Sequence, residues 1–468
     1  MVGRIALVTL AVLATHARAE SPVVGGRTPR SIGRAGVGTA SDDGGGALLV
    51  NPAAMARREA ARMQLGVAFL DDEMSWLHAS SSPVNRDQSS SRLLPMLAIE
   101  GAFEDWVFGA GVITNARTER LLRQPGVNAP AGDYGKTFEY RYDGFAGSFR
   151  RDTLMAGGAH RIGDTVAIGL SISASRVEVS ELRRVWAGDT NRKIPGTTPG
   201  TTMNEQTGDP TQDVELGMTG TGYTPGVVAG VLVAPESTSL EIAASASWMG
   251  PARATGTVSG HGAIPESQYA VALDSNHARI EVEQPVTVRT GVRWLSERWI
   301  AELGGDLWVA PNQARSPVWR FDGLSIVDST TIGATREINV AQLPSRMSTR
   351  THGALRAAID VELIAGFLWA TAGYSFATAG TAGTRLSPTF GDLGGHTAAI
   401  GLEATAGGFT VTFGAARTWS VKQNEPASAW KLDNPFGTGD SMVPEGTYDG
   451  SVDMLGVSID AELWAPAD

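Results

Sequence analysis

The chain has 468 residues and no cysteine, and its 49 acidic residues outnumber its 38 basic ones, for a formal net charge of −11 at pH 7. The lack of cysteine excludes a disulfide scaffold, thiol catalysis and cysteine-ligated metal sites. The acidic balance argues against nucleic acid as a partner, because binding to a polyanion needs clustered basic residues.

The first 19 residues have the pattern of a secretory signal peptide. Residues 1–4 form a short basic start, an apolar run follows at residues 5–14, and an A-x-A cleavage site at residues 17–19 precedes Glu20. We therefore expect an exported protein whose mature chain begins at Glu20. No later stretch reaches the roughly 18 consecutive apolar residues that a membrane-spanning helix requires.

A glycine-rich segment, residues 33–56, follows and ends in Asn51-Pro52-Ala53. Its glycines permit backbone paths closed to other residues and occupy little volume, as a chain folded inside a narrow lumen requires. Pro52 lacks an amide donor and restricts the residue before it, so the segment cannot simply continue as a strand. The Asn51 amide can bond exposed backbone groups at this kink. By itself, the tripeptide also fits an ordinary turn in a solvated leader.

From residue 63 onward, apolar and polar residues alternate over long runs. The clearest run, residues 280–294, has mostly apolar even positions and charged odd positions, and residues 299–310 repeat the pattern. A hairpin that pairs Trp294 with Trp299 would place the charges of both runs on one water-facing side. These charges are Arg289, Arg293, Glu302 and Asp306.

Roughly 14 candidate strands follow from such patterns. They fall at about residues 63–70, 93–103, 106–115, 138–160, 165–180, 222–234, 239–249, 279–294, 299–310, 349–361, 367–377, 396–405, 409–421 and 451–464. Every second connection is short, and the others are long and rich in Gly, Pro, Thr and Asp. A soluble sandwich remains possible for any single hairpin, but it has no reason to sort its loops in this way. We predict an all-β fold, a transmembrane antiparallel β-barrel of about 14 strands.

The segment 33–56 resembles the N-terminal hatch of the FadL/TodX outer-membrane transporters of hydrophobic compounds. The likeness rests on Ala35-Gly36, Thr39-Ala40, Asp42-Asp43 and Asn51-Pro52-Ala53, and residues 446–463 are similar to the closing strand of that family. The resemblance implies a signal peptide at residues 1–19, a hatch that plugs the lumen at 20–62, and a barrel with long extracellular loops at 63–468. It also implies the outer membrane of a Gram-negative cell, with outer-membrane lipid, a hydrophobic small-molecule ligand and the barrel assembly machinery as partners.

The resemblance further implies passive, substrate-gated uptake of long-chain fatty acids or related hydrocarbons and lipids, gated at Asn51, Pro52 and Ala53. The loop expected at residues 181–221 is mostly polar where the family has part of a hydrophobic groove, so a long-chain fatty acid is not assured. Inward arginines could bind an acidic headgroup or form a structural ion-pair network with inward carboxylates. The arginines are Arg289, Arg293 and Arg356, and the carboxylates are Glu302, Asp306 and Asp360.

Two other functions stay open. One is a plugged barrel whose surface loops bind a partner without transport, and the other is a water-filled porin, against which the hatch argues. The sequence contains no H-E-x-x-H, G-x-S-x-G or Walker pattern, so we expect no enzyme, no cofactor and no metal site. We expect His160 and His352 to be polar residues on the inner wall.

Overall fold

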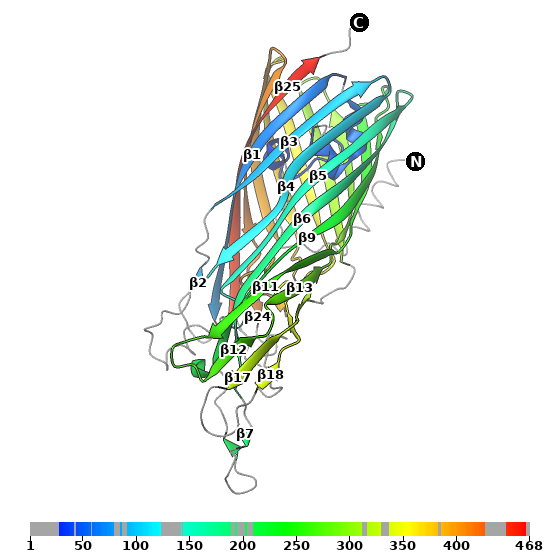
Figure 1. Cartoon of the computed structure of the whole chain (residues 1–468). Coiled ribbons are helices and arrows are strands. Elements are labelled where there is room, and N and C mark those ends of the chain that lie inside the picture. Colours follow the sequence, from blue (N-terminus) through cyan, green and yellow to red (C-terminus); the bar gives the residue numbers. More distant parts are fainter. Residues whose placement is uncertain are drawn as a thin grey trace.

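The structure is a computed structural model of the chain (Figure 1). It describes residues 28–41, 44–57, 59–78, 85–86, 91–122, 142, 144–188, 192–193, 202–203, 209–310, 316–328, 337–381, 385–425 and 446–464. The expected signal peptide and residues 20–27 of the expected hatch lie outside this part of the chain. Within it, no helix has the length and apolar character needed to cross a membrane.

The described chain forms a closed, antiparallel 14-strand barrel (Figure 1), which confirms the predicted fold class. Around the ring, the strands are β1 (Ala61–His78), β3 (Arg92–Phe103), β4 (Trp106–Leu121), β5 (Ala146–Ile162), β6 (Val166–Trp186), β9 (Asp213–Val233), β10 with β11 (Leu240–Met249, Ala252–Gly262), β14 with β13 (Val286–Leu295, His277–Val282), β15 with β16 (Trp299–Val309, Val318–Phe321), β20 (His352–Ile364), β21 (Leu368–Ala377), β22 (Gly395–Ala406), β23 (Phe409–Ser420) and β25 (Gly446–Trp464). The first and last of these pair along their whole lengths, from His78 opposite Gly446 to Ala61 opposite Trp464. Closure leaves no unpaired sheet edge in lipid.

Short connections gather at one end of the barrel and long ones at the other (Figure 1). In outer-membrane barrels, the short turns face the periplasm and the long loops face the outside. Three loop strands, β12 (Tyr269–Leu273), β17 (Leu324–Asp328) and β18 (Glu337–Asn339), make a small separate sheet at the extracellular end. The other short strands are β2 (Asn85–Arg86), β7 (Arg192–Lys193), β8 (Thr202–Met203), β19 (Gln342–Pro344) and β24 (Gln423–Glu425), and a 3-10 turn, η3, covers Pro210–Gln212.

The alternation predicted the facing of the side chains correctly on β14 and β15. Val288 and Trp294 are outward and about 40% exposed, whereas Arg293, Glu302 and Asp306 are buried inside. The predicted pairing was off by two residues, because Trp294 lies opposite Ala301. A register shift of two residues leaves every side chain on the same face of the sheet, so the faces were still assigned correctly.

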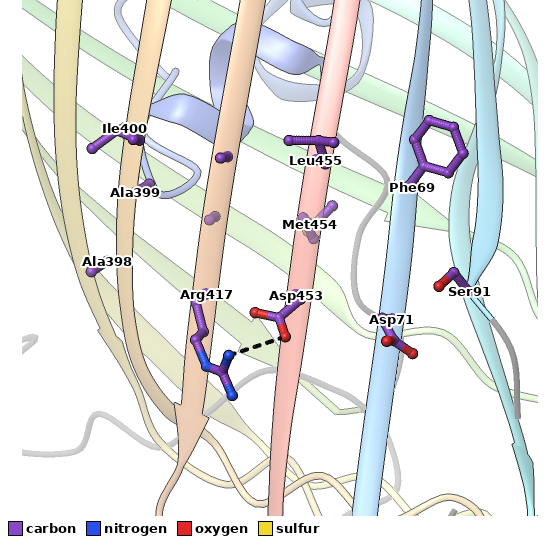
Figure 2. A pocket seen from close by; sticks show the side chains of 12 residues that line it. Phe69, Asp71, Ser91, Ala398, Ala399, Ile400, Arg417, Asp453, Met454 and Leu455 are labelled. Carbon is purple, nitrogen blue, oxygen red and sulfur yellow. Dashed lines mark ion pairs between the residues drawn. The ribbon is translucent and has the colours of Figure 1, made fainter. Parts of the chain in front are cut away.

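Exposed apolar side chains form a belt around the barrel. On one side of the barrel, charged residues follow this belt toward the loops (Figure 2). A shallow hollow of about 580 Å³ lies on the outer surface of β22, β23, β25 and β1. Ile400 on β22, Leu455 on β25 and Phe69 on β1 point outward around it. One row nearer the loops, Arg417 and Asp453 form an ion pair of 3.4 Å. This row lies near the extracellular edge of the belt, where the exposed Trp419 follows Arg417 on β23, as aromatic residues do at the edge of such a belt.

Some strands differ from the prediction. The run predicted at 279–294 is interrupted between Val282 and Val286, where Pro285 has no amide to donate. The run at 239–249 resumes after Pro251 as β11. The expected loop 181–221 is shorter, because β6 continues to Trp186 and β9 begins at Asp213. Apolar and polar residues continue to alternate in β6 and β9 past the edge of the apolar belt, so these two strands extend beyond the belt toward the extracellular end.

The described part of the hatch, residues 28–41 and 44–57, lies inside the ring (Figure 1). It contains the helices α2 (Pro29–Gly33) and α3 (Ala47–Val50) and the 3-10 helix η1 (Pro52–Arg57). Thr28 caps α2, since its Oγ1 accepts the Ser31 amide at 3.1 Å. Apolar hatch residues share a buried cluster with inward residues of the wall, and a second cluster fills the extracellular half of the barrel.

Candidate functional site

One buried arginine holds the first half of the hatch. Arg34, which is 1% exposed, donates from Nη2 to Glu302 Oε2 at 2.9 Å and lies 3.5 Å from Asp360 Oδ2. The Ala40 amide donates to Glu302 Oε1, also at 2.9 Å. Glu302 on β15 therefore binds the hatch at two points, and both of its oxygens are satisfied.

The Asn51 carboxamide fixes the second half. Its Nδ2 donates to the Thr39 carbonyl at 2.9 Å and to the Val231 carbonyl at 3.3 Å, and its Oδ1 accepts the Ala53 amide at 3.2 Å. Asn51 is fully buried. One side chain thus joins two parts of the hatch to each other and to the wall strand β9.

Wall glycines and serines allow the hatch to approach this closely. A Cβ on Gly230 would overlap Asn51 Oδ1, and one on Gly169 would overlap the Ala53 amide. Ser171 and Ser245 donate to the Leu48 and Val50 carbonyls, each at 2.6 Å. The kink at residues 51–53 is therefore seated against the wall by shape as well as by hydrogen bonds.

The wall arginines singled out in the sequence lie in the lumen beside carboxylates or polar groups. Arg356 donates to Asp306 Oδ2 at 2.9 Å and to the Ala35 carbonyl at 2.8 Å. Arg293 donates to Glu241 Oε2 at 3.2 Å. Arg289 donates to the Ser247 hydroxyl at 3.4 Å.

This arrangement resembles the structural ion-pair network more than an open headgroup site. Of the expected partners, Arg356 and Asp306 are paired, whereas the other expected carboxylates, Glu302 and Asp360, lie beside a hatch arginine. Arg34 forms ion pairs with Glu302 and Asp360, and Arg57 Nη2 lies 2.5 Å from Glu241 Oε2. The network therefore ties the hatch to the wall as well as one wall strand to the next.

The hydrogen-bonded ladder between β3 and β4 ends early. The β3–β4 ladder runs from Phe103 opposite Trp106 only as far as Met96 opposite Ile113, although both strands continue beyond this point. A bulge at Asn115 interrupts the pairing of β4 with β5, and residues 113–116 are buried in succession. A bulge bends its strand. Beyond the bulge, side chains join the two strands in place of the ladder, since Arg92 Nε on β3 lies 2.7 Å from Glu119 Oε2 on β4.

Arg151 lies behind this bulge on the inward face of β5. Its Nε donates to Asn115 Oδ1 at 2.9 Å, and its Nη1 contacts Gln284 Oε1 at 2.9 Å and Met249 Sδ at 3.2 Å. All of these acceptors are neutral. In the part of the chain that the structure describes, no carboxylate lies within 4.0 Å of its guanidinium.

Residues 10–303, more than half of the chain, match the family described as outer membrane protein transport protein (OMPP1/FadL/TodX). The chain belongs to this family. It is therefore an outer-membrane transport protein with the FadL/TodX fold.

Solved structures agree with this FadL/TodX assignment. The chain is 12% identical to a Pseudomonas aeruginosa FadL homologue, with a TM-score of 0.70 over 96% of this chain and 100% of that chain. It is 14% identical to the Pseudomonas putida toluene transporter TodX, with a TM-score of 0.62 over 94% of this chain and 99% of that chain. At such identities the likeness shows the fold. No curated protein sequence matches the chain.

Sequence reasoning missed several residues of this FadL/TodX lumen. It did not single out Arg34, Arg57, Glu241 or Arg151. A signal existed for Glu241, because it shares the polar parity of the run 239–249. For Arg34, the signal was an arginine inside a segment expected to be enclosed.

The two histidines face opposite sides of the wall. His352 is inward and buried, as expected. His160 was assigned wrongly, because it shares the outward parity of Leu154 and stacks on Trp106 with ring centroids 4.3 Å apart. Across the described residues, no group of three or more His, Asp or Glu side chains is placed to hold a metal ion.

Proposed function

We propose that this protein mediates passive, substrate-gated uptake of hydrophobic small molecules and releases them through the wall. The observation that carries the proposal is the end of the β3–β4 ladder at Met96 and Ile113, beside a lumen that the hatch occupies. A filled lumen disfavours a straight aqueous path. A break in the wall offers an apolar ligand a route that avoids water.

We infer that Asn51, Pro52 and Ala53 form the gating element. Their hold on the wall depends on a few hydrogen bonds and on the close fit at Gly230. Each buried polar group that loses its partner costs roughly 1 to 3 kcal/mol. Changes of this size can shift a gate without unfolding the barrel.

The ligand class we favour is an amphiphile with an acidic headgroup, such as a fatty acid. Arg151 suits a carboxylate better than Arg293 or Arg356, because those two already face Glu241 and Asp306. Arg289 is a second candidate for binding the acidic headgroup. A neutral hydrocarbon would need none of these arginines.

Uptake by cells that lack their own transporter tests this function. We expect cells that express the protein to take up a labelled long-chain fatty acid faster than cells with an empty vector. Arg151→Gln should slow fatty-acid uptake about tenfold, because it removes a charge-assisted contact, and should leave toluene uptake unchanged. Arg176→Gln is the matched control, since Arg176 faces outward and pairs with Glu178.

The outcomes separate the alternatives. Equal loss of both ligands in Arg151→Gln would show a structural role for Arg151 and would remove the argument for an acidic ligand. No uptake of either ligand by the wild type would favour the plugged barrel whose loops bind a partner. Steady single-channel conductance would instead indicate a water-filled porin.

A further inference from the structure

The barrel wall has a second interruption, nearer the extracellular end. β13 pairs with β16 only at residues 278–279, and β14 pairs with β15 only from residue 286 onward. Among the described residues, 280–285 have no strand partner on this side. A cleft of about 570 Å³ lies here. Its lining includes three arginines and two glutamates, Arg253, Arg279, Arg320, Glu281 and Glu283.

The sheet register lines up hydrogen-bond donors across this cleft. Thr255 on β11 lies opposite Arg279 on β13, Arg279 lies opposite Arg320 on β16, and Arg320 lies opposite Gln342 on β19. All of these side chains are exposed. Two arginines directly opposite each other destabilise a strand pair through charge repulsion. An anion between them would remove that cost and bind several donors at once.

Nearby carboxylates offset only part of this charge. Arg279 Nη2 lies 3.2 Å from Asp322 Oδ1, and Arg253 Nε lies 3.3 Å from Glu281 Oε2. In the described ranges, no carboxylate lies within 4.0 Å of the Arg320 guanidinium. The donor row itself contains no acidic residue, and Arg279 and Arg253 have the carboxylate partners given above, so the guanidinium charge without a nearby carboxylate is that of Arg320.

The donor row lies on the flank of the barrel, just beyond the apolar belt. Exposed Val288 belongs to the belt on β14, and the charged Glu281 and Arg279 follow on β13. On β9, the exposed Tyr223 lies opposite Arg253, as aromatic residues do at the edge of a belt. At this height, the barrel contacts the headgroups of the outer leaflet, which is rich in phosphate-bearing glycolipid.

We propose that the cleft between β13 and β16 binds a phosphate group of an outer-leaflet glycolipid, with Arg279 and Arg320 as its main ligands. The planar guanidinium fork matches phosphate oxygens and forms charge-assisted hydrogen bonds with them. Thr255 and Gln342 extend the row on both sides. The site is separate from the hatch and from Arg151 and does not depend on the transport proposal.

Native mass spectrometry of the purified, folded protein tests this site. The probes are a phosphorylated lipid A, the same lipid after removal of its phosphates, and inorganic phosphate. We expect the wild type to retain phosphorylated lipid A and to bind the dephosphorylated form about tenfold more weakly. Arg279→Gln with Arg320→Gln should cause a similar loss, and the Lys pair at the same positions should cause a smaller one.

Arg176→Gln is the matched control, because Arg176 is also an outward arginine near the belt edge and pairs with Glu178 at 2.5 Å. It should retain the lipid as the wild type does. Equal binding of phosphorylated and dephosphorylated lipid by the wild type would overturn the proposal, even if the double variant failed to fold. Equal loss in the control, or full displacement of the lipid by inorganic phosphate at equal concentration, would also overturn it.

Discussion

Asn51 shows how one side chain can fasten a plug. Replacing it with alanine would leave the Thr39 and Val231 carbonyls without their donor and the Ala53 amide without its acceptor. We expect Asn51→Ala to loosen the hatch by roughly 1 to 3 kcal/mol while the barrel still assembles. Limited proteolysis of the folded protein should cut the hatch faster. Asn424→Ala, at an exposed asparagine of β24, should not change this rate.

Gly230 makes the same contact from the side of the wall. A methyl group there would overlap Asn51 Oδ1, so Gly230→Ala should reproduce the proteolysis of Asn51→Ala. Gly101→Ala is the control, because the nearest atom to a Cβ at Gly101 is 3.9 Å away. A hatch that stays protected in Gly230→Ala would contradict the close fit described here.

Among the elements, β15 carries the charged anchor of the hatch. Arg34→Met would leave Glu302 buried without its charge partner, and the loss of one member of a buried pair costs roughly 3 to 5 kcal/mol. Adding Glu302→Gln should recover part of this loss. Urea unfolding of the hatch in a double-mutant cycle measures the coupling. Additive effects would mean that the two residues do not act as a pair.

The facing of β6 gives a further prediction. Leu170 is outward and 54% exposed within the belt, whereas Tyr223 lies opposite Arg176 at the charged boundary. Leu170→Arg should cost about 2 to 4 kcal/mol, and Tyr223→Arg about 0 to 1 kcal/mol. The folded fraction in unboiled gels checks both variants. Equal tolerance of the two would contradict the assigned position of the belt.

The same elements show what the sequence could predict. The alternation of period two is local, so the outward Val288 and the inward Arg293 were assigned correctly. The register of a hairpin depends on the geometry of its turn, which the alternation does not specify, so the pairing of Trp294 with Ala301 was missed by two positions. Arg34 and Glu302 are 268 residues apart, and neither segment alone indicates the other.

The whole molecule combines a filled lumen with a wall in which the β3–β4 ladder ends early. We infer that the bulge at Asn115 ends this ladder, because one extra residue shifts the facing of everything that follows it. Deleting Asn115 would remove the bulge, so inward and outward side chains would alternate without a break from residues 106–114 into the rest of β4. The strand could then pair with β3 over its full length and close the wall.

The central measurement is fatty-acid uptake by cells with equal amounts of folded wild type, Asn115 deletion and Asn115→Ala. The alanine variant keeps the bulge but removes the amide that contacts Arg151, so it separates the opening from that contact. We expect the deletion to reduce uptake to the level of cells without the protein and Asn115→Ala to retain most of it. Wild-type uptake by the folded deletion variant would contradict release through the wall.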